Sequence, residues 1–510
     1  MKSFRLLWGS ILTTLLCATL ALAQTGSIQG TVTDSVGAVV QGAEITVRNL
    51  GSNATRTATS SGTGAYSIPS LPPAAYDITV KMASFKTFHA TDVQLTVAQV
   101  LSVNVELEPG AVTEEVQVRA DQLPAVDLET AQVSNLVDER SIKDLPLITR
   151  NPYELVLLSP GTSQTNTSLG GISVNGSRER NNNFLLDGVD NNDTSVPGII
   201  GGVLSADPES TQEFRVITNT FNAEYGRNTG AIIDVITKSG TNTFHGNAYE
   251  FGRWNAFGGA RDWFNRVGNP QDPYTRNQFG YSIGGPIRKN KTFFFFNHEM
   301  DRFVTTLTGT ATVPTAAFKT GVFNFTYIDP NTLGTNTVPV DLTPSGSNNV
   351  YGLPLDPTMQ QIFALYPNPT SSADGVSGTI HYPSSSRTSS YQTVAKIDHH
   401  FADKHTLSAR YGYDHSFDPN PFHDDILPGN VGATSSKSIA QGVSANLISS
   451  LSTNVLNSFN FGWNHIYANF NCTGRDVLDN VSPLDQFGNA RDYYMDPFTS
   501  FGCLSLVSNG

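Results

Sequence analysis

Residues 459–467 read Phe-Asn-Phe-Gly-Trp-Asn-His-Ile-Tyr, and this pattern decides the fold class. Its odd positions are mainly aromatic, while its even positions are mainly Asn or Gly. Successive side chains of a β-strand point to opposite faces, so this strand has one apolar face and one polar face. The same alternation recurs in other stretches after residue 240. They lie at residues 278–283, 392–401, 405–414 and 438–447.

Strands that are apolar outside and polar inside are typical of an outer-membrane β-barrel, although a soluble sandwich also alternates. The polar face here carries Asn, Ser, Gly, Arg and Asp, which suits a hydrated lumen. A stretch rich in Pro, Gly, Asn and Ser separates Phe303 from Thr388, as expected of an extracellular loop. Phe293 to Phe296 fit either a membrane-interface cluster, which we favour, or a buried strand core.

The predicted strands in residues 241–510 are too few to close a barrel. We count about eight, whereas barrels that hold a plug have about 22. Closure is compulsory in lipid, because an open edge leaves unpaired backbone groups in hydrocarbon. We therefore expect an incomplete barrel from a longer chain, and residues 241–510 are not expected to form a stable barrel alone.

The N-terminus predicts export. Lys2 and Arg5 precede an apolar run that ends in Ala21-Leu22-Ala23, the pattern of a signal peptide over residues 1–23. A membrane anchor is the less favoured alternative, because the run is short for a span. Export would allow Cys472 and Cys503 to pair, and the sequence leaves that pairing open.

Composition narrows the class further. The chain has 510 residues and a net charge of −13, without a basic run, so nucleic acid is not an expected partner. Charged residues make up 15%, below the roughly 25% of soluble domains. No apolar run after the signal approaches the roughly 20 residues of a membrane helix, so strands would have to cross a membrane.

Residues 24–109 predict an Ig-like β-sandwich, because about seven short strands alternate with turn residues. Several of its segments resemble carboxypeptidase regulatory-like domains, which have a carbohydrate-binding-like fold. These segments are residues 30–34, 42–43, 64–66 and 71–76. Ala74 and Ser84 stand where that family usually has Gly, so we expect less tight turns there.

Residues 110–240 place short apolar strands within loops rich in Gly, Asn and Asp, as expected of a small domain inside a wet lumen. The ordered set of segments resembles the α+β plug of Oar-type TonB-dependent receptors. The resemblance implies a mainly β chain: a sandwich, a plug, and the first strands of a 22-stranded transmembrane barrel. The plug-motif residues are Asn175, Gly176, Arg178, Asp187, Gly188, Asp190, Glu224, Tyr225, Gly226, Thr237, Lys238, Ser239 and Gly240.

The segment that follows the predicted sandwich resembles a TonB box, which a periplasmic partner grips and pulls. An extended segment of this kind can add as a strand to a partner's sheet. A linker strand or the first plug strand is an equally weighted alternative. The candidate contact residues are Val112, Thr113, Glu114, Glu115, Val116, Gln117 and Val118.

Motifs for chemistry are weak. Residues 280–284 fit G-x-S-x-G, but alternation runs straight through them, whereas a nucleophile elbow needs a strained turn before a helix. No His begins a zinc-peptidase motif. Asp187, Asp190 and Asp193 do not have the spacing of an EF-hand loop. We expect no enzyme activity, catalytic residue, metal or cofactor.

The favoured function is energised uptake of an unidentified substrate across the outer membrane. The expected partners are a periplasmic TonB-type energy-coupling protein, outer-membrane lipid and an extracellular substrate. Siderophore, oligosaccharide and peptide all remain open. The alternative is a non-enzymatic surface-binding protein whose sandwich holds glycan or protein, with Tyr66 and Tyr76 as ring candidates that are more often core residues. A secreted hydrolase is disfavoured.

Overall fold

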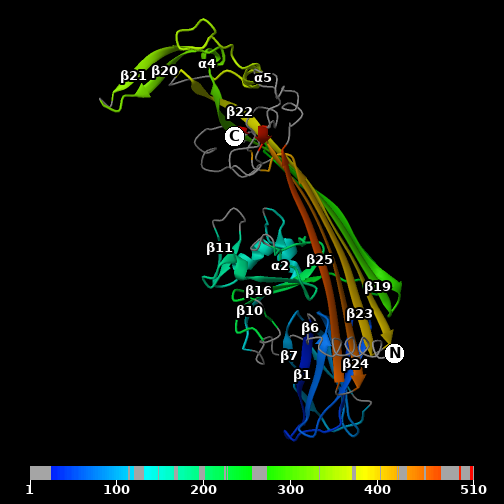
Figure 1. Cartoon of the computed structure of the whole chain (residues 1–510). Coiled ribbons are helices and arrows are strands. Elements are labelled where there is room, and N and C mark those ends of the chain that lie inside the picture. Colours follow the sequence, from blue (N-terminus) through cyan, green and yellow to red (C-terminus); the bar gives the residue numbers. More distant parts are fainter. Residues whose placement is uncertain are drawn as a thin grey trace, which may run out of the picture.

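A computed structural model of the chain gives the fold. It describes residues 25–112, 115–119, 131–147, 149–165, 171–194, 201–222, 225–226, 228–255, 273–331, 334–369, 375–402, 404–421, 423, 433–452, 455–472, 493–495 and 506–508. The predicted signal peptide lies outside these residues. Nearly all of the described elements are strands (Figure 1). Among the described residues, no helix has both the length and the apolar character needed to cross a bilayer.

The N-terminal part is a sandwich of two sheets. One sheet has the order β4-β1-β7 with β8 also paired to β1, and the other has the order β3-β2-β5-β6-β9. The strands are β1 Gly26–Asp34, β2 Glu44–Asn49, β3 Thr55–Thr59, β4 Ala65–Leu71, β5 Ala74–Lys81, β6 Thr87–Leu95, β7 Val100–Ser102, β8 Val105–Leu107 and β9 Glu115–Arg119. Alternate residues such as Ile45, Val47, Ile78 and Val80 are buried between the sheets. Their burial supplies the hydrophobic stabilisation of this domain.

The described residues between 131 and 240 form a second unit, here called the middle domain. Its sheet has the order β10-β15-β16-β13-β14, in which β13 and β16 are parallel. These strands are β10 Val133–Val137, β13 Asn183–Leu186, β14 Val189–Asp190, β15 Thr211–Asn219 and β16 Ile232–Thr237. A helix α2 (Glu139–Asp144), the 3-10 helices η2 (Pro152–Leu158) and η3 (Glu179–Asn181), and the hairpin of β11 (Thr162–Gln164) and β12 (Ile172–Val174) complete it.

The third unit is a seven-stranded antiparallel sheet, here called the long sheet, with the order β17-β18-β19-β22-β23-β24-β25. Its strands are β17 His245–Trp254, β18 Tyr274–Arg288, β19 Thr292–Pro314, β22 Ser377–Ala402, β23 His405–Asp418, β24 Thr434–Ser452 and β25 Val455–Cys472. Each strand pairs with the next along the chain, so the sheet is a meander. A short hairpin of β26 (Tyr493–Met495) and β27 (Leu506–Ser508) follows it.

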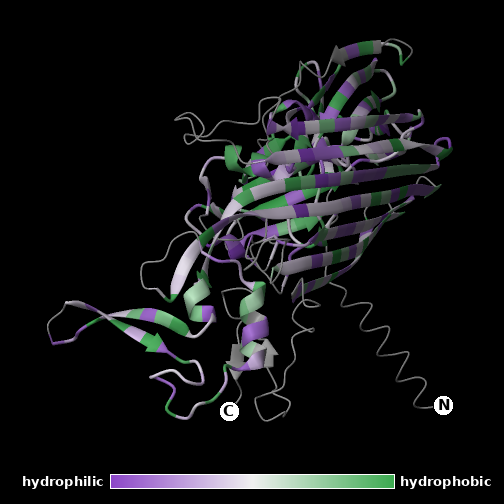
Figure 2. Ribbon diagram, turned by 90° about the horizontal axis from the view of Figure 1, so that it is seen from above, coloured by the Kyte–Doolittle hydropathy of each residue, from purple (hydrophilic) through white to green (hydrophobic). Residues whose placement is uncertain are grey.

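The burial of the long sheet is inverted relative to a soluble protein. Its exposed side chains include Tyr281, Ile397 and Trp463, whereas Asn297 and Arg410 are buried. The alternation along each strand is visible in Figure 2. Polar side chains therefore face the middle domain, and apolar side chains face outward, as the sequence pattern predicts.

Two details differ from the sequence prediction. Phe293 and Phe295 are buried on the inner face, so the favoured interface-cluster interpretation is wrong for these two residues. Strand parity is the reason, since Phe294 and Phe296 point to the other face. The predicted loop between Phe303 and Thr388 is also shorter, because β19 and β22 remain paired as far as Pro314 and Ser377.

The connection between β19 and β22 has its own structure. It contains the helices α4 (Ala316–Lys319) and α5 (Pro357–Leu365) and the hairpin of β20 (Val322–Ile328) and β21 (Thr335–Asp341). In Figure 1 this connection lies at one end of the long sheet, and the sandwich lies near the other. Arg56 of the sandwich donates to the hydroxyls of Ser450 and Thr406 at that second end, at 3.1 and 3.3 Å.

Backbone strain at Ser84 in the sandwich can be tested by substitution with glycine. It adopts φ +70°, which is strained for a residue with a Cβ, so Ser84→Gly is expected to stabilise the sandwich by about 1 kcal/mol. Urea unfolding of residues 25–119 measures this change. Ser35→Gly is the matched control, because Ser35 lacks a positive φ and the added freedom should destabilise slightly. Equal effects of the two substitutions would contradict the assignment of strain to Ser84.

Candidate functional site

The turn between β13 and β14 is built by Asp187 and Gly188. Both residues have positive φ, +47° and +77°, and they connect the paired residues Leu186 and Val189. A two-residue hairpin loop favours Asp-Gly because both positions need φ above zero. Local sequence chemistry thus forms a tight turn that carries a carboxylate at its tip.

Asp187 is buried, with 4% of its surface exposed, and is surrounded by donors. Its Oδ2 accepts from the Thr237 hydroxyl at 2.6 Å, and its Oδ1 accepts from the Thr237 amide at 3.0 Å. Lys396 Nζ lies 3.3 Å from Oδ1, and Arg410 Nε lies 2.8 Å from Oδ2. Burial alone would raise the pKa of Asp187, but the charges of Lys396 and Arg410 and the Thr237 hydrogen bonds hold this pKa below its ordinary value.

Four successive strands of the long sheet contact this turn. Lys396 on β22 and Arg410 on β23 are direct cross-strand partners, and like charges in that position repel each other. Asn446 on β24 donates to the Asp187 carbonyl at 3.0 Å, and Asn464 on β25 donates to the Asp190 carbonyl at 2.6 Å. Asp187 therefore supplies a shared counter-charge between two cations that the sheet alone would leave opposed.

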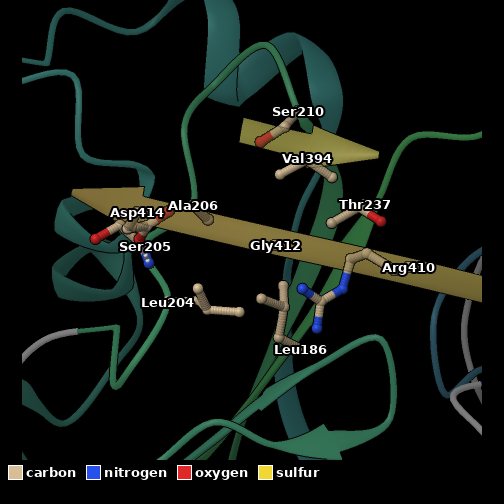
Figure 3. A pocket seen from close by; sticks show the side chains of 10 residues that line it. All are labelled: Leu186, Leu204, Ser205, Ala206, Ser210, Thr237, Val394, Arg410, Gly412 and Asp414. Atoms are coloured by element: carbon tan, nitrogen blue, oxygen red, sulfur yellow. Dashed lines mark hydrogen bonds between the residues drawn. The ribbon is translucent and has the colours of Figure 1, made fainter. Parts of the chain in front are cut away.

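Glycines on the inner face of the long sheet let the middle domain approach closely. A Cβ at Gly442 would lie 2.6 Å from Leu204 Cδ1, and a Cβ at Gly462 would lie 2.1 Å from Val189 Cγ1. Figure 3 shows Leu204 and Leu186 beside Arg410, with Ser205 next to Asp414. The Ser205 amide donates to Asp414 Oδ2 at 2.7 Å. Apolar contacts are thus interleaved with buried polar ones.

A second contact joins the middle domain to β17, β18 and β19, and on β18 the Gln278 amide donates to the Thr149 carbonyl at 3.2 Å. Arg150 lies 3.6 Å from a carboxylate oxygen of Glu299, and its guanidinium stands 3.8 Å from the ring centroid of Phe251. Asn297 on β19 donates to Asp207 Oδ2 at 2.9 Å. The middle domain is therefore held by charged and polar groups across the whole width of the long sheet.

The predicted plug-motif residues fall into several groups. Asp187, Gly188, Asp190 and Thr237 meet at the turn described above. Lys238 pairs within the middle domain, where its Nζ is 3.3 Å from Glu139 of α2. Gly240 lies at the border of the long sheet, where a Cβ would lie 2.3 Å from the Phe294 carbonyl. The remaining residues lie elsewhere: Asn175, Gly176, Arg178, Tyr225 and Gly226 are at the domain surface or partly exposed, and Ser239 is half-buried. Glu224 lies outside the described residues.

The candidate TonB-contact segment forms the edge of the sandwich. Glu115 to Arg119 make up β9, which pairs in parallel with β6. Val112 is exposed, and its carbonyl accepts from the Thr87 hydroxyl at 2.8 Å. Thr113 and Glu114 lie outside the described residues. Part of the segment is therefore already paired with the sheet of its own domain.

The middle domain also grips the sandwich. Arg215 on β15 donates from Nε to the Val97 carbonyl at 2.6 Å and from a terminal nitrogen to Thr96 Oγ1 at 2.9 Å. The Val97 amide donates to Glu213 Oε1 at 2.5 Å. Val97 has no exposed surface, and Glu213 and Arg215 are buried. Burial raises the pKa of Glu213 to about 7.

Sequence reasoning did not single out the partners of the motif residues. Lys396, Arg410 and Glu299 lie on the inner face of strands, where the sequence predicted polar side chains in general. A charged residue on the inner face of such a strand is the signal that could have found them. Arg150, Glu213 and Arg215 gave no comparable signal, because their roles depend on contacts between domains.

The structure places the two tyrosines and the G-x-S-x-G motif that the sequence raised as candidates for function. Tyr66 and Tyr76 are buried, with 5% and 2% of their surfaces exposed, and their hydroxyls donate to the carbonyls of Val103 and Pro72. Both rings therefore belong to the sandwich core rather than to a ligand platform. Residues 280–284, which fit G-x-S-x-G, lie within β18. In the part of the chain that the structure describes, no group of three or more His, Cys, Asp or Glu side chains is arranged to hold a metal ion.

A long sheet that is apolar outside, polar inside and in contact with an inner domain defines a protein that crosses a membrane with strands. The chain belongs to the outer membrane beta barrel domain family, whose model matches residues 236–503, and it is a protein of the outer membrane. Residues 27–108 match the carboxypeptidase regulatory-like domain. Both matches agree with the resemblances seen in the sequence.

One curated relative is the TonB-dependent transporter Oar of Myxococcus xanthus. It is 31% identical over 295 residues, which are 55% of this chain and 27% of the relative. The chain thus matches about a quarter of that relative's length. The relative confirms the resemblance to Oar-type TonB-dependent receptors.

Solved structures with some similarity include the outer membrane transporter YddB from Escherichia coli, at 13% identity over 67% of this chain and 40% of that chain, with a TM-score of 0.42. A ferric enterobactin receptor from Pseudomonas aeruginosa is 11% identical over 66% of this chain and 40% of its own, with a TM-score of 0.38.

The contact around Asp187 predicts a large loss of stability on neutralisation. Asp187→Asn leaves Lys396 and Arg410 buried without their counter-charge, so we expect a loss of about 3–5 kcal/mol. Urea unfolding of the full chain, followed by protease resistance of the middle domain, measures it. Asp190→Asn is the control and is expected to cost about 1 kcal/mol, because the Asp190 carboxylate accepts from neighbouring Asn192.

A second substitution sharpens this prediction. Lys396→Met in the Asp187→Asn background removes one uncompensated cation, so part of the lost stability should return. If Lys396→Met instead adds its own loss to that of Asp187→Asn, the two residues are not coupled.

The raised pKa of Glu213 predicts that the contact between the middle domain and the sandwich depends on pH. Its pKa rises from an ordinary 4.5 to about 7 in the folded protein. Its contribution to stability is therefore full below about pH 4.5 and is lost as the pH rises through about 7. From pH 6 to pH 8 the contact should weaken by on the order of 1 kcal/mol, measured as faster hydrogen exchange of the Val97 region after correction for the intrinsic rate. Glu213→Gln should abolish this dependence, and an unchanged dependence in that variant would exclude Glu213 as its source.

Proposed function

We propose that this chain serves energised uptake of a substrate across the outer membrane. In this proposal the long sheet is part of the barrel wall, and the middle domain is the plug that closes its lumen. The sandwich and the plug face the periplasm, whereas the β20–β21 hairpin faces the outside. The relative from Myxococcus xanthus is a TonB-dependent transporter, which supports this assignment.

The observation that carries the proposal is the polar, multi-strand seat of the Asp187 turn. Lys396, Arg410, Asn446 and Asn464 hold it from four neighbouring strands. A contact built from charges and amides separates into water at less cost than an apolar one, because each group regains hydration. Such a seat suits a plug that must leave its position and return.

The energy for this movement would come from a periplasmic TonB-type protein that grips residues 112–118. The segment lies after the sandwich and before the middle domain, so a pull on it acts on both. Val112 and Gln117 are exposed, which makes them accessible to a partner. The substrate would bind from outside, and the residues of the long connection between β19 and β22 are its candidate contacts.

A substrate-free assay tests the proposal. Ala206 is buried where the middle domain meets the long sheet, so an Ala206→Cys thiol should react with fluorescein maleimide when the plug moves. In energised native cells carrying the full-length protein, we expect labelling that a protonophore suppresses and that deletion of residues 112–118 abolishes. The chain without the introduced thiol gives the background from Cys472 and Cys503. Energy-dependent labelling that survives the deletion would refute coupling through this segment.

A further inference from the structure

The candidate partner-binding segment is integrated into the sandwich. Strand β9 forms register pairs with β6 from Thr87 with Glu115 to Thr91 with Arg119. The approach to β9 is held as well, because the Gly110 amide donates to the Ser84 carbonyl at 3.2 Å. In the described sheet, β9 is the last strand in the order, so one of its edges is paired and the other is an outer edge.

Strand β6 leads directly from this pairing to the middle domain. It ends at Leu95, and the next two residues, Thr96 and Val97, are those gripped by β15. Both backbone polar groups of Val97 are bound by buried side chains, the Glu213 carboxyl at the amide and the Arg215 cation at the carbonyl. Hydrogen bonds to charged groups are roughly twice as strong as neutral ones. This contact therefore attaches the end of β6 directly to β15.

The attachment continues toward the seat of the plug. Arg215 lies on β15, which pairs antiparallel with β16, and β16 ends at Thr237. Thr237 is the residue whose hydroxyl and amide both bind the carboxylate of Asp187. A continuous series of paired strands and charged contacts therefore connects β9 with the Asp187 turn.

From this arrangement, and resting on the function proposed above, we propose that the sandwich is the handle through which the partner's pull reaches the plug. The partner is a protein with an exposed strand edge that adds to the outer edge of β9 while β9 remains paired with β6. The load then passes along β6 to the Glu213–Arg215 contact and into β15. The unit that the partner binds is the folded sandwich rather than a free peptide.

The chemistry of β9 fits this partner. An unpaired strand edge presents a row of N–H and C=O groups that another strand can pair with. Gln117 is exposed and Val116 is half-buried, so one face of β9 packs on its own domain while the other is free for side-chain contacts. A pull along β9 strains the parallel ladder to β6 along its length, so its hydrogen bonds share the load.

A reversible disulfide between β6 and β9 tests whether β9 acts while it is paired with β6 or only as a released peptide. His89 and Gln117 are register partners, and directly paired strand positions lie within disulfide reach. We would introduce His89→Cys with Gln117→Cys in the full-length Ala206→Cys protein, oxidise the pair with copper phenanthroline, and measure energy-dependent labelling at position 206. If the sandwich transmits the pull as a folded unit, labelling of the disulfide-linked protein should stay within about twofold of that of the protein without the disulfide. Loss of labelling that dithiothreitol restores would overturn the proposal, because β9 would then have to leave β6. Each single-cysteine variant is the matched control.

The attachment to β15 is tested by Arg215→Met, which keeps the length of the side chain and removes its donors. We expect labelling to fall to background while the TonB-type protein still co-purifies with the chain. Thr96→Val changes only the sandwich side and covers the case in which Arg215→Met does not assemble; it should lower labelling by roughly fivefold, the effect of one net hydrogen bond. Arg48→Met is the control, since it breaks an ion pair with Asp77 inside the sandwich.

The outcomes distinguish the two proposals. If labelling at position 206 does not depend on energy, the uptake function itself fails. If energy-dependent labelling survives deletion of residues 112–118, coupling through this segment fails, and the handle with it. If that deletion abolishes labelling but Arg215→Met and Thr96→Val leave it at the wild-type level, the function stands and the handle is wrong.

Discussion

Lys396 and Arg410 stand opposite each other on neighbouring strands of a buried polar face, and the Asp187 carboxylate lies between them. Two like charges in that position oppose the pairing of β22 with β23. The middle domain therefore stabilises the long sheet as much as the sheet holds the middle domain. Much of the inner face follows the same rule, because its polar side chains find their partners on the other unit.

The inverted polarity of the long sheet explains why the interface is polar. In a bilayer the outward side chains must be apolar, and the backbone must be satisfied within the sheet. Alternation then leaves the inner positions for polar groups and for small residues. Gly442 and Gly462 use those positions to admit Leu204 and Val189, while Asn446 and Asn464 use them to donate to the turn. The same inner face therefore allows the middle domain to approach closely and provides the polar contacts that can separate again.

The sandwich is bound to both other units, although its own core is complete. Glu213 and Arg215 hold its Thr96–Val97 turn, and Arg56 reaches the end of the long sheet. These are polar contacts to a few positions, in contrast to the continuous apolar core inside the sandwich. A folded module attached in this way moves as a body, because the contacts within it are more extensive than those around it.

The sequence by itself determined the features that depend on local chemistry. Period-two alternation assigned side chains such as Trp463 and Asn464 to opposite faces. The Asp187-Gly188 pair favours, by its own local chemistry, the tight turn that the structure shows. The tertiary structure decided the partners. It brought Asp187 to Lys396, 209 positions away, buried Phe293 and Phe295 inside, and placed Glu115 to Arg119 at the edge of the sandwich. Periodicity and turn propensity are encoded by neighbours in the chain, whereas the pairing of distant groups depends on strand register and on how separate domains fit together.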